Sequence, residues 1–281
     1  MLLRSYAKIN LSLDILRKRE DGYHEVDMIM QTIDLYDIIE LMPTDDSDII
    51  IRCNKKYVPN DNRNTAYKAA EHFFNVFDIH KGVNIVIKKN IPVSAGMAGG
   101  SSNAAAVYRG LRSMFKPEVN NDELRELSVK TGSDVPFCIS GGTAICRGIG
   151  EKITNIKSFK DKILVVVKPN FGVSTTEIYK RFDMSKIFKH PDNRILKQAI
   201  ERDNLPLVCR EMRNLLENVT IGMHPKIKEI KKELLSFGSL GSMMTGSGPT
   251  VFGFFDDMLT AQRAFVKMRS KFDEVFITRT M

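Results

Sequence analysis

One segment limits what this chain can fold into more than any other. Residues 92–103 read Pro-Val-Ser-Ala-Gly-Met-Ala-Gly-Gly-Ser-Ser-Asn. They follow residues 83–87, whose alternating apolar side chains are typical of a strand, and they lead into a helical pattern that begins near Ser101. Glycines allow the backbone to approach a ligand, and the unpaired N–H groups at a helix start attract phosphate. We therefore predict a phosphate-binding loop, although a glycine-rich connection without any ligand has the same signature.

Two familiar nucleotide-binding loops do not fit this segment. A Walker A loop requires a lysine and a Ser or Thr directly after its last glycine, and no such lysine is present. The Gly-x-Gly-x-x-Gly pattern of dinucleotide-binding folds is also missing after a strand. A nucleotide would have to be bound by a loop of another class.

Periodicity along the chain predicts an α+β protein. Residues 8–15 alternate strictly, with Lys8, Asn10, Ser12 and Asp14 on the polar face of a predicted half-buried strand. The pattern changes near residue 155, so we predict an N-terminal domain at 1–155 and a C-terminal domain at 156–281. The other predicted elements are strands at 24–33, 37–42, 163–167, 250–255 and 274–279 and helices at 64–77, 101–115, 191–202, 205–217, 225–236 and 257–271.

Composition excludes several classes of protein. The four cysteines form no Cys-x-x-Cys pair and the five histidines show no metal-ligand spacing, so the residues alone predict no metal site. No apolar run approaches the roughly 18 residues of a membrane span, and Arg4 and Lys8 interrupt any signal-peptide core. We expect a cytoplasmic protein without a membrane partner. The net charge of +8 suits an anionic partner, but a lysine-rich solvated surface is the more common explanation.

The loop and four further motifs resemble one enzyme family. Residues 96–102 resemble the phosphate-binding motif of the GHMP kinases, with Met97 where leucine is commoner. The other motifs resemble the 4-diphosphocytidyl-2-C-methyl-D-erythritol kinases within that superfamily, and the similarity runs in order from about residue 4 to 255. They are Ala-Lys-Ile-Asn-Leu at 7–11, Asp-Gly-Tyr-His at 21–24, Gly-Ser-Asp-Val-Pro-Phe at 132–137 and Thr-Gly-Ser-Gly-Pro-Thr at 245–250.

This resemblance implies a fold and an activity. The fold would have two lobes, an N-terminal one like ribosomal protein S5 domain 2 and a C-terminal one like a ferredoxin sandwich, with the substrates meeting between them. The activity would be ATP- and Mg²⁺-dependent phosphorylation of the C2 hydroxyl of the cytidylated erythritol, in non-mevalonate isoprenoid precursor synthesis. The expected partner is that small molecule and no nucleic acid, and the expected state is a monomer or weak homodimer.

Two residues are candidates for the chemistry. Phosphorylation of an alcohol needs a proton acceptor, and Asp134 is the candidate base, although an aspartate before Pro136 also suits a helix N-cap. In kinases that this chain resembles, the lysine matching Lys8 lies beside the aspartate and keeps it ionised. Without the resemblance, Lys8 reads as a solvated strand residue.

The remaining candidates are assigned by resemblance and by the needs of the ligands. Asn10 shares the face of Lys8 and is expected to bind substrate, while Tyr23, His24 and Tyr179 would stack on and hydrogen-bond the cytosine. Tyr23 and His24 have equally good structural explanations as a turn residue and a packed histidine. Thr175 is also assigned to the substrate. The expected ATP-binding residues are Pro92, Val93, Ser94, Ala95, Gly96, Met97, Ala98, Gly99, Gly100, Ser101 and Ser102, with Asn64 and Lys89 as further members.

Three other functions compete with this hypothesis. Another GHMP kinase would accept homoserine, mevalonate or a sugar in place of the cytidylated alcohol. A nucleic-acid-binding protein would show steeply salt-dependent RNA binding without any need for Asp134. A regulator that only binds nucleotide would bind ATP yet release no ADP.

Overall fold

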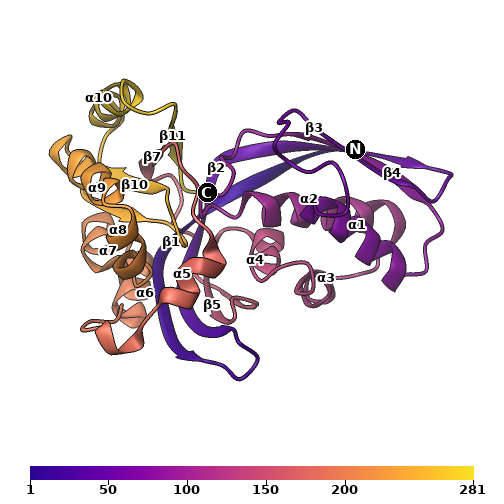
Figure 1. Ribbon diagram of the computed structural model, residues 1–281, viewed down its shortest axis with the longest axis horizontal. Coiled ribbons are helices and arrows are strands. Elements are labelled where there is room, and N and C mark those ends of the chain that lie inside the picture. The colour runs from indigo at the N-terminus through magenta and orange to yellow at the C-terminus, as the bar shows by residue number, and fades with distance from the viewer. The chain divides into compact units, whose positions relative to one another are not determined.

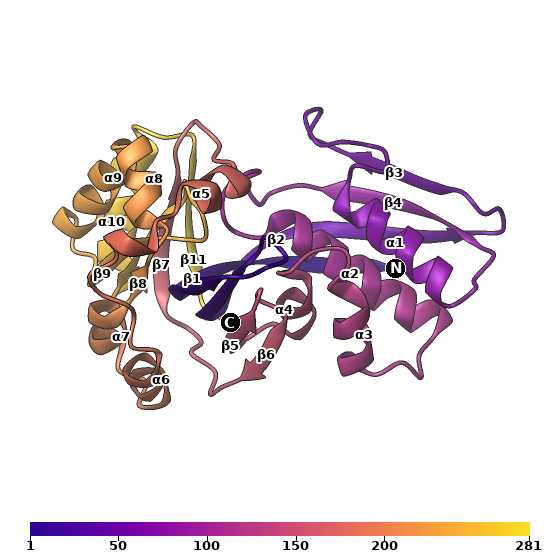
Figure 2. The same ribbon diagram turned by 60° about the horizontal axis from the view of Figure 1, so that its bottom comes forward.

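The computed structural model describes residues 1–281, and the chain forms two compact units that alternate along the sequence (Figures 1 and 2). Unit 1 comprises Met1–Ala7, Leu35–Ile91 and Ala98–Gly141, and unit 2 comprises Lys8–Asp34, Pro92–Met97 and Gly142–Met281. The two longest strands, β1 (Leu2–Lys18) and β2 (His24–Thr44), supply residues to both units. The units are therefore not two consecutive stretches of chain.

Unit 1 packs helices on one face of a small sheet. Strands β3 (Ile49–Cys53) and β4 (Gly82–Lys88) run parallel, and β4 pairs antiparallel with the second half of β2. Helices α1 (Thr65–Val76) and α2 (Gly99–Phe115) lie side by side (Figures 1 and 2), because alanines and aromatic residues fill their shared apolar face. The other helices are α3 (Asn121–Ser128) and α4 (Val135–Ser140). Asn120 and Glu123 form a capping box at the start of α3.

Unit 2 contains a four-stranded antiparallel sheet in the order β11-β7-β10-β9. Chain order with its helices is β-α-β-β-α-β, the ferredoxin-like arrangement that the resemblance implied. Its strands are β7 (Ile163–Lys168), β9 (Gly241–Met244), β10 (Val251–Phe255) and β11 (Glu274–Arg279). Its helices include α9 (Lys226–Ser236) and α10 (Met258–Arg269), which pack on the sheet. The prediction of an α+β fold with this second half is confirmed.

The rest of unit 2 lies along the second half of β1 and the first half of β2. Strand β5 (Thr143–Gly148) pairs with β2 and with β6 (Lys152–Asn155), while β8 (Arg213–Asn214) pairs with β1. Four short helices and one 3₁₀ turn complete the unit. They are α5 (Thr175–Arg181), the turn η1 (Met184–Lys186), α6 (Asn193–Glu201), α7 (Leu205–Glu211) and α8 (Glu217–Met223).

Three local predictions are wrong. The predicted strands at 24–33 and 37–42 are one continuous strand. The predicted helix at 205–217 ends at Glu211, because the chain turns to form β8 against β1. The polar face of β1 is buried instead of solvated, with Lys8, Asn10, Ser12 and Asp14 all less than 9% exposed.

Candidate active site

The start of helix α2 is open to an anion. Its N-cap is Ala98, in the left-handed conformation at φ 55°, and no side chain caps the helix. Ser101 and Ser102 do not cap it either, because both lie inside the helix, beyond the capping position. The first N–H groups of a helix have no intrahelical partner, so Gly99, Gly100 and Ser101 present unpaired donors at the positive end of a 17-residue helix. This arrangement is suited to bind phosphate.

Two of the predicted ATP-binding side chains have structural partners in unit 1. The hydroxyl of Ser102 donates to the carbonyl of Tyr6 at 2.6 Å and accepts from Ser5 at 2.8 Å, and its residue is 2% exposed. Asn64 is the N-cap of α1 and donates to the carbonyl of Pro59. Both side chains shape the frame of unit 1, and their contact with a nucleotide stays a prediction.

Lys89 lies directly behind the helix start. A Cβ placed on Gly99 would fall 2.8 Å from its ammonium, so a larger residue there would require the lysine side chain to shift. The ammonium pairs with the buried carboxylate of Asp37 and lies 3.3 Å from Oδ1 of Asn103. Asp37 is not among the residues predicted for the site. It lies between Asp34 and Glu40 on β2, so no local pattern distinguishes it from these acidic residues.

Asp134 occupies the N-cap position of α4, but its carboxylate makes no capping hydrogen bond. The preceding turn is fixed by a buried hydrogen-bond chain: Tyr108 on α2 bonds Thr131 at 2.6 Å and His72 on α1 at 3.0 Å. Burial raises the pKa of Tyr108 to about 12, so its hydroxyl keeps its proton. Gly132 in the same turn lies against the Ser101 hydroxyl at the start of α2. Tyr108 is not among the residues predicted for the site.

In unit 2, the first half of the glycine-rich loop meets the second glycine-rich turn. Gly96 has φ +72°, and a Cβ on it would fall 2.3 Å from the carbonyl oxygen of Thr245. Gly246 has φ +57°, and its Cβ would fall 2.7 Å from the carbonyl oxygen of Gly96. Ser94 also has a left-handed backbone, at φ 52°. The two turns are thus in backbone contact, which only glycines at both positions permit.

Lys8 and Asn10 point the same way from β1, as the period-two pattern predicted. The ammonium of Lys8 donates to Oδ1 of Asn10 at 2.8 Å, and its backbone N–H donates to the Met97 carbonyl. Oδ1 of Asn10 also accepts from the backbone N–H of Gly246, and the Asn10 N–H donates to the hydroxyl of Thr245 at 3.1 Å. Asn10 is fully buried, and through these hydrogen bonds it links Lys8 to the second glycine-rich turn.

The predicted cytosine residues divide into two groups. His24 and Tyr179 are in ring contact, with centroids 5.2 Å apart, and Thr175 on the same helix α5 bonds Ser247 of the second turn at 2.8 Å. Burial, with a smaller contribution from Lys18, lowers the pKa of His24. Tyr23 is 58% exposed at the end of the β1–β2 hairpin.

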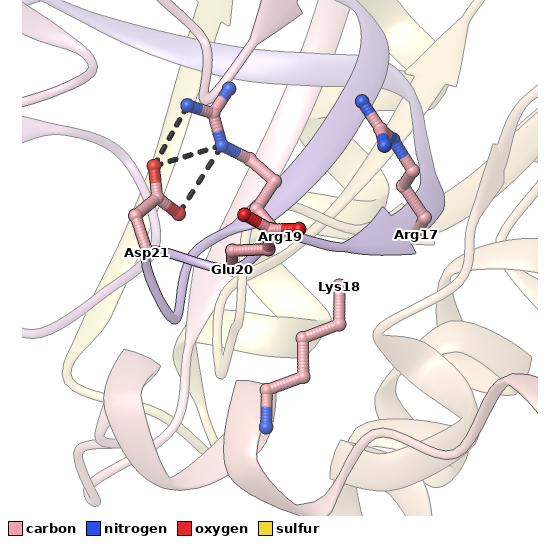
Figure 3. A pocket seen from close by; sticks show the side chains of 5 residues that line it. All are labelled: Arg17, Lys18, Arg19, Glu20 and Asp21. Atoms are coloured by element: carbon pink, nitrogen blue, oxygen red, sulfur yellow. Dashed lines mark hydrogen bonds and ion pairs between the residues drawn. The ribbon is translucent and has the colours of Figure 1, made fainter.

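The tip of that hairpin forms a small polar pocket, residues 17–21 (Figure 3). Arg19 and Asp21 face each other there through a paired set of hydrogen bonds, the shortest 2.7 Å, while Lys18 points away from them. The Asp21 carboxylate also accepts from the N–H of Tyr23 and so fixes the turn that carries Tyr23.

The chain matches two family models, GHMP kinases N terminal domain at residues 64–142 and GHMP kinases C terminal at residues 196–274. It is 56% identical to the 4-diphosphocytidyl-2-C-methyl-D-erythritol kinase of Clostridium botulinum strain Langeland, over 100% of both chains. The chain belongs to this family of GHMP kinases. The family predicted from the motifs is confirmed.

Solved structures agree with this assignment. One is a crystal structure of a 4-(cytidine 5'-diphospho)-2C-methyl-D-erythritol kinase, with a TM-score of 0.84 and 29% sequence identity. The match covers 100% of this chain and 99% of the other. A homoserine kinase from Cytophaga hutchinsonii, at 16% identity and a TM-score of 0.77 over 100% of this chain and 94% of its own, shares the fold.

The chain lacks two further features. Its helices lack the combination of length and apolar character that crossing a bilayer requires. Its His, Cys, Asp and Glu side chains form no group of three or more suited to hold a metal ion.

Proposed function

We propose that this chain transfers the γ-phosphoryl group of ATP to the C2 hydroxyl of 4-diphosphocytidyl-2-C-methyl-D-erythritol, a step of non-mevalonate isoprenoid precursor synthesis. Membership in the family supplies the acceptor. The observation that supports the kinase chemistry is the uncapped start of α2, where Gly99, Gly100 and Ser101 present unpaired N–H groups. These donors and the helix dipole would hold the phosphates of ATP and stabilise the charge that develops on the transferred group.

A bound Mg²⁺ ion would neutralise phosphate charge in the reaction. Mg²⁺ commonly keeps several waters and binds through substrate phosphates plus one or two protein groups, so a site without a cluster of acidic side chains fits it. The Ser101 hydroxyl is the protein ligand we propose, because the neighbouring Ser102 hydroxyl already bonds Tyr6 and Ser5.

The acceptor is activated by Asp134 in this mechanism. Its carboxylate takes the proton of the C2 hydroxyl as that oxygen forms its bond to the γ-phosphorus, and the bond from the γ-phosphorus to the bridging oxygen breaks to release ADP. Lys8 would polarise the hydroxyl and stabilise the charge that develops on it. Asn10, which accepts a hydrogen bond from Lys8, would hold that ammonium in place.

The cytidine would be recognised by the aromatic residues of unit 2. Stacking on an aromatic ring is worth roughly 1–3 kcal/mol per base. We assign this role to Tyr23 and Tyr179, with His24 as hydrogen-bond partner and Thr175 beside it. A lowered pKa keeps His24 neutral at neutral pH, so one of its ring nitrogens can accept a hydrogen bond from the cytosine amino group.

ADP release measured against a panel of alcohols tests the acceptor. We expect release with the cytidylated erythritol and none above background with homoserine, mevalonate or galactose. Release with one of those alcohols instead would assign the chain to another GHMP kinase activity. Binding of ATP with no release from any alcohol would indicate a nucleotide-binding regulator.

Replacement of Asp134 tests the mechanism. Asn caps helices as well as Asp does, so Asp134→Asn preserves any capping by this residue and removes only the base. We expect kcat to fall by about 10²–10⁴-fold, with KM for both substrates changing much less. Turnover within about threefold of wild type would remove Asp134 from the mechanism.

The remaining predictions concern where the enzyme acts, its oligomeric state and its partners. We propose that it acts in the cytoplasm, as a monomer or weak homodimer, without a nucleic-acid or membrane partner. Light scattering measures the oligomeric state, and titration with RNA at low and high salt tests the nucleic-acid alternative. A division of the chain into domains near residue 155 also stays a prediction.

A further inference from the structure

The buried carboxylate of Asp37 joins both ends of the phosphate-binding loop. Asp37 is 0% exposed. Its Oδ1 accepts the backbone N–H groups of Asn90 at 2.7 Å and Ile91 at 2.8 Å, which directly precede the loop. Its Oδ2 accepts from the ammonium of Lys89 and, at 2.8 Å, from the side-chain amide of Asn103, the last residue of the loop segment 92–103. A single side chain of β2 thus holds the loop where it begins and where it ends.

The charge at this point is balanced inside unit 1. Lys89 is 5% exposed, and its ammonium is the cation that faces Asp37. A buried ion pair whose lone pairs are all used gives little net stability, whereas loss of one partner leaves an uncompensated buried charge. Asn103 is itself held in place by a further hydrogen bond, because its side-chain amide also donates to the Ser5 hydroxyl at 2.8 Å. Such networks specify geometry more than they contribute stability.

Fixed loop ends matter because phosphate binding depends on aligned N–H groups. The donors at Gly99, Gly100 and Ser101 lie two to four residues before Asn103, one turn earlier in the same helix α2. A loop with free ends would lose conformational entropy on binding ATP, and that loss would weaken the affinity. We propose that Asp37 is a positioning residue: together with Asn103 it holds the phosphate-binding loop in the conformation that receives ATP. This inference rests on the proposed function only in taking ATP as the ligand.

Two variants test the proposal, read out by MgATP affinity in calorimetry and by KM for ATP. Asn103→Ala removes the contact at the loop end and keeps the Asp37–Lys89 pair, so we expect a folded protein with MgATP affinity weakened about tenfold and kcat at saturating ATP within about threefold. Asp37→Asn should weaken MgATP further, since it disturbs both loop ends. The matched control is Asp45→Asn, which removes an exposed ion pair with Lys81 in the same unit and should leave MgATP affinity unchanged.

A double-mutant cycle separates positioning from simple stability. If both residues act through one contact, Asp37→Asn combined with Asn103→Ala should bind MgATP no more weakly than Asp37→Asn alone. All affinities are measured well below the lowest melting temperature, with folding checked by circular dichroism. Additive losses, or variants that lower the melting temperature while MgATP affinity stays within twofold of wild type, would overturn the proposal.

The same measurements distinguish this inference from the proposed function. Calorimetry with MgATP requires no acceptor. If wild type binds MgATP but releases no ADP with the cytidylated erythritol, the acceptor assignment fails and the variants still decide the role of Asp37. If wild type binds no MgATP, both fail.

Discussion

Two glycines of this chain, Gly96 and Gly142, differ in how much space their surroundings leave for a side chain. Gly96 and Gly142 have almost the same backbone angle, φ +72° and +74°, yet their surroundings are opposite. A Cβ on Gly96 would meet the Thr245 carbonyl at 2.3 Å, whereas a Cβ on Gly142 would meet nothing within 4 Å. The pair therefore separates the cost of a left-handed backbone from the cost of displacing a neighbouring backbone.

We expect Gly142→Ala to lower the free energy of unfolding by about 1–2 kcal/mol, the cost of a left-handed conformation for alanine. Gly96→Ala should lower it by more, because the Thr245 carbonyl is backbone and must move with its turn. It should also raise KM for ATP, since Gly96 belongs to the predicted phosphate-binding loop. Urea unfolding and steady-state kinetics measure both effects. Equal losses of stability in the two variants would contradict the contact between the glycine-rich turns.

At the residue scale, sequence predicts shared faces better than it predicts burial. Alternation along β1 placed Lys8 and Asn10 on one face, and their side chains are hydrogen-bonded. The same alternation suggested that this face is solvated, but it is buried. Asn10 meets Thr245, and Ser12 and Asp14 meet Asn193 and His190. These partners lie more than 170 residues further along the chain, and no local pattern reveals what will cover a strand face.

At the element scale, helix α2 connects the unpaired N–H groups at its own N-terminus with the turn that carries Asp134. Its first turn presents the unpaired N–H groups, and its third turn presents the buried hydroxyl of Tyr108 to Thr131 and His72. The two features share one rigid element, so the turn before α4 is held at a fixed place along α2. Helical spacing predicted α2 and its apolar face. It could not predict the hydroxyl contacts, because Tyr108 fits that face as an ordinary aromatic residue.

Removal of the Tyr108 hydroxyl tests this link. Tyr108→Phe keeps the ring and deletes two hydrogen bonds, so we expect the free energy of unfolding to fall by about 1–2 kcal/mol, with the partly buried Thr131 hydroxyl losing this partner. Because the turn before Asp134 loses a fixed contact, kcat should fall several-fold while KM for ATP stays close to wild type. Tyr57→Phe, at a residue 66% exposed, is the control. A rise in KM for ATP without a change in kcat would contradict this assignment.

At the scale of the whole molecule, the family and the fold class were predictable because several motifs occur in order along the chain. The interleaving of the units was not. It arises because β1 and β2 are long enough to supply residues to both, and period-two patterns show where strands lie but not how many units a strand serves. The short pairing of β8 with β1 is likewise a long-range contact that replaced part of a predicted helix.

Each unit contains one histidine that makes the protein sensitive to mild acid. Burial is the main cause that lowers the pKa of His24 in unit 2 and of His72 in unit 1 below the ordinary value of 6.5. The unfolded chain therefore takes up protons on these histidines near pH 6.5, while the folded chain takes them up only at lower pH. The free energy of unfolding rises with pH across that interval, so stability is lost as the pH falls from about 6.5 toward the folded pKa values.

We expect the melting temperature of wild type to decrease as the pH is lowered from 7.5 to 5.5. The melting temperature of the double variant His24→Gln and His72→Asn should decrease less. Asn at position 72 can still offer a polar group to Tyr108.

The carboxylates with lowered pKa, such as Asp61 at about 2, lose their contribution to stability below about pH 3.8 and do not act in this interval. Asp14, whose pKa burial raises, acts in the opposite direction, because its penalty is relieved as the pH falls. His80→Gln, at a ring 84% exposed, is the control, and a double variant that melts with the same pH dependence as wild type would show that neither histidine is responsible.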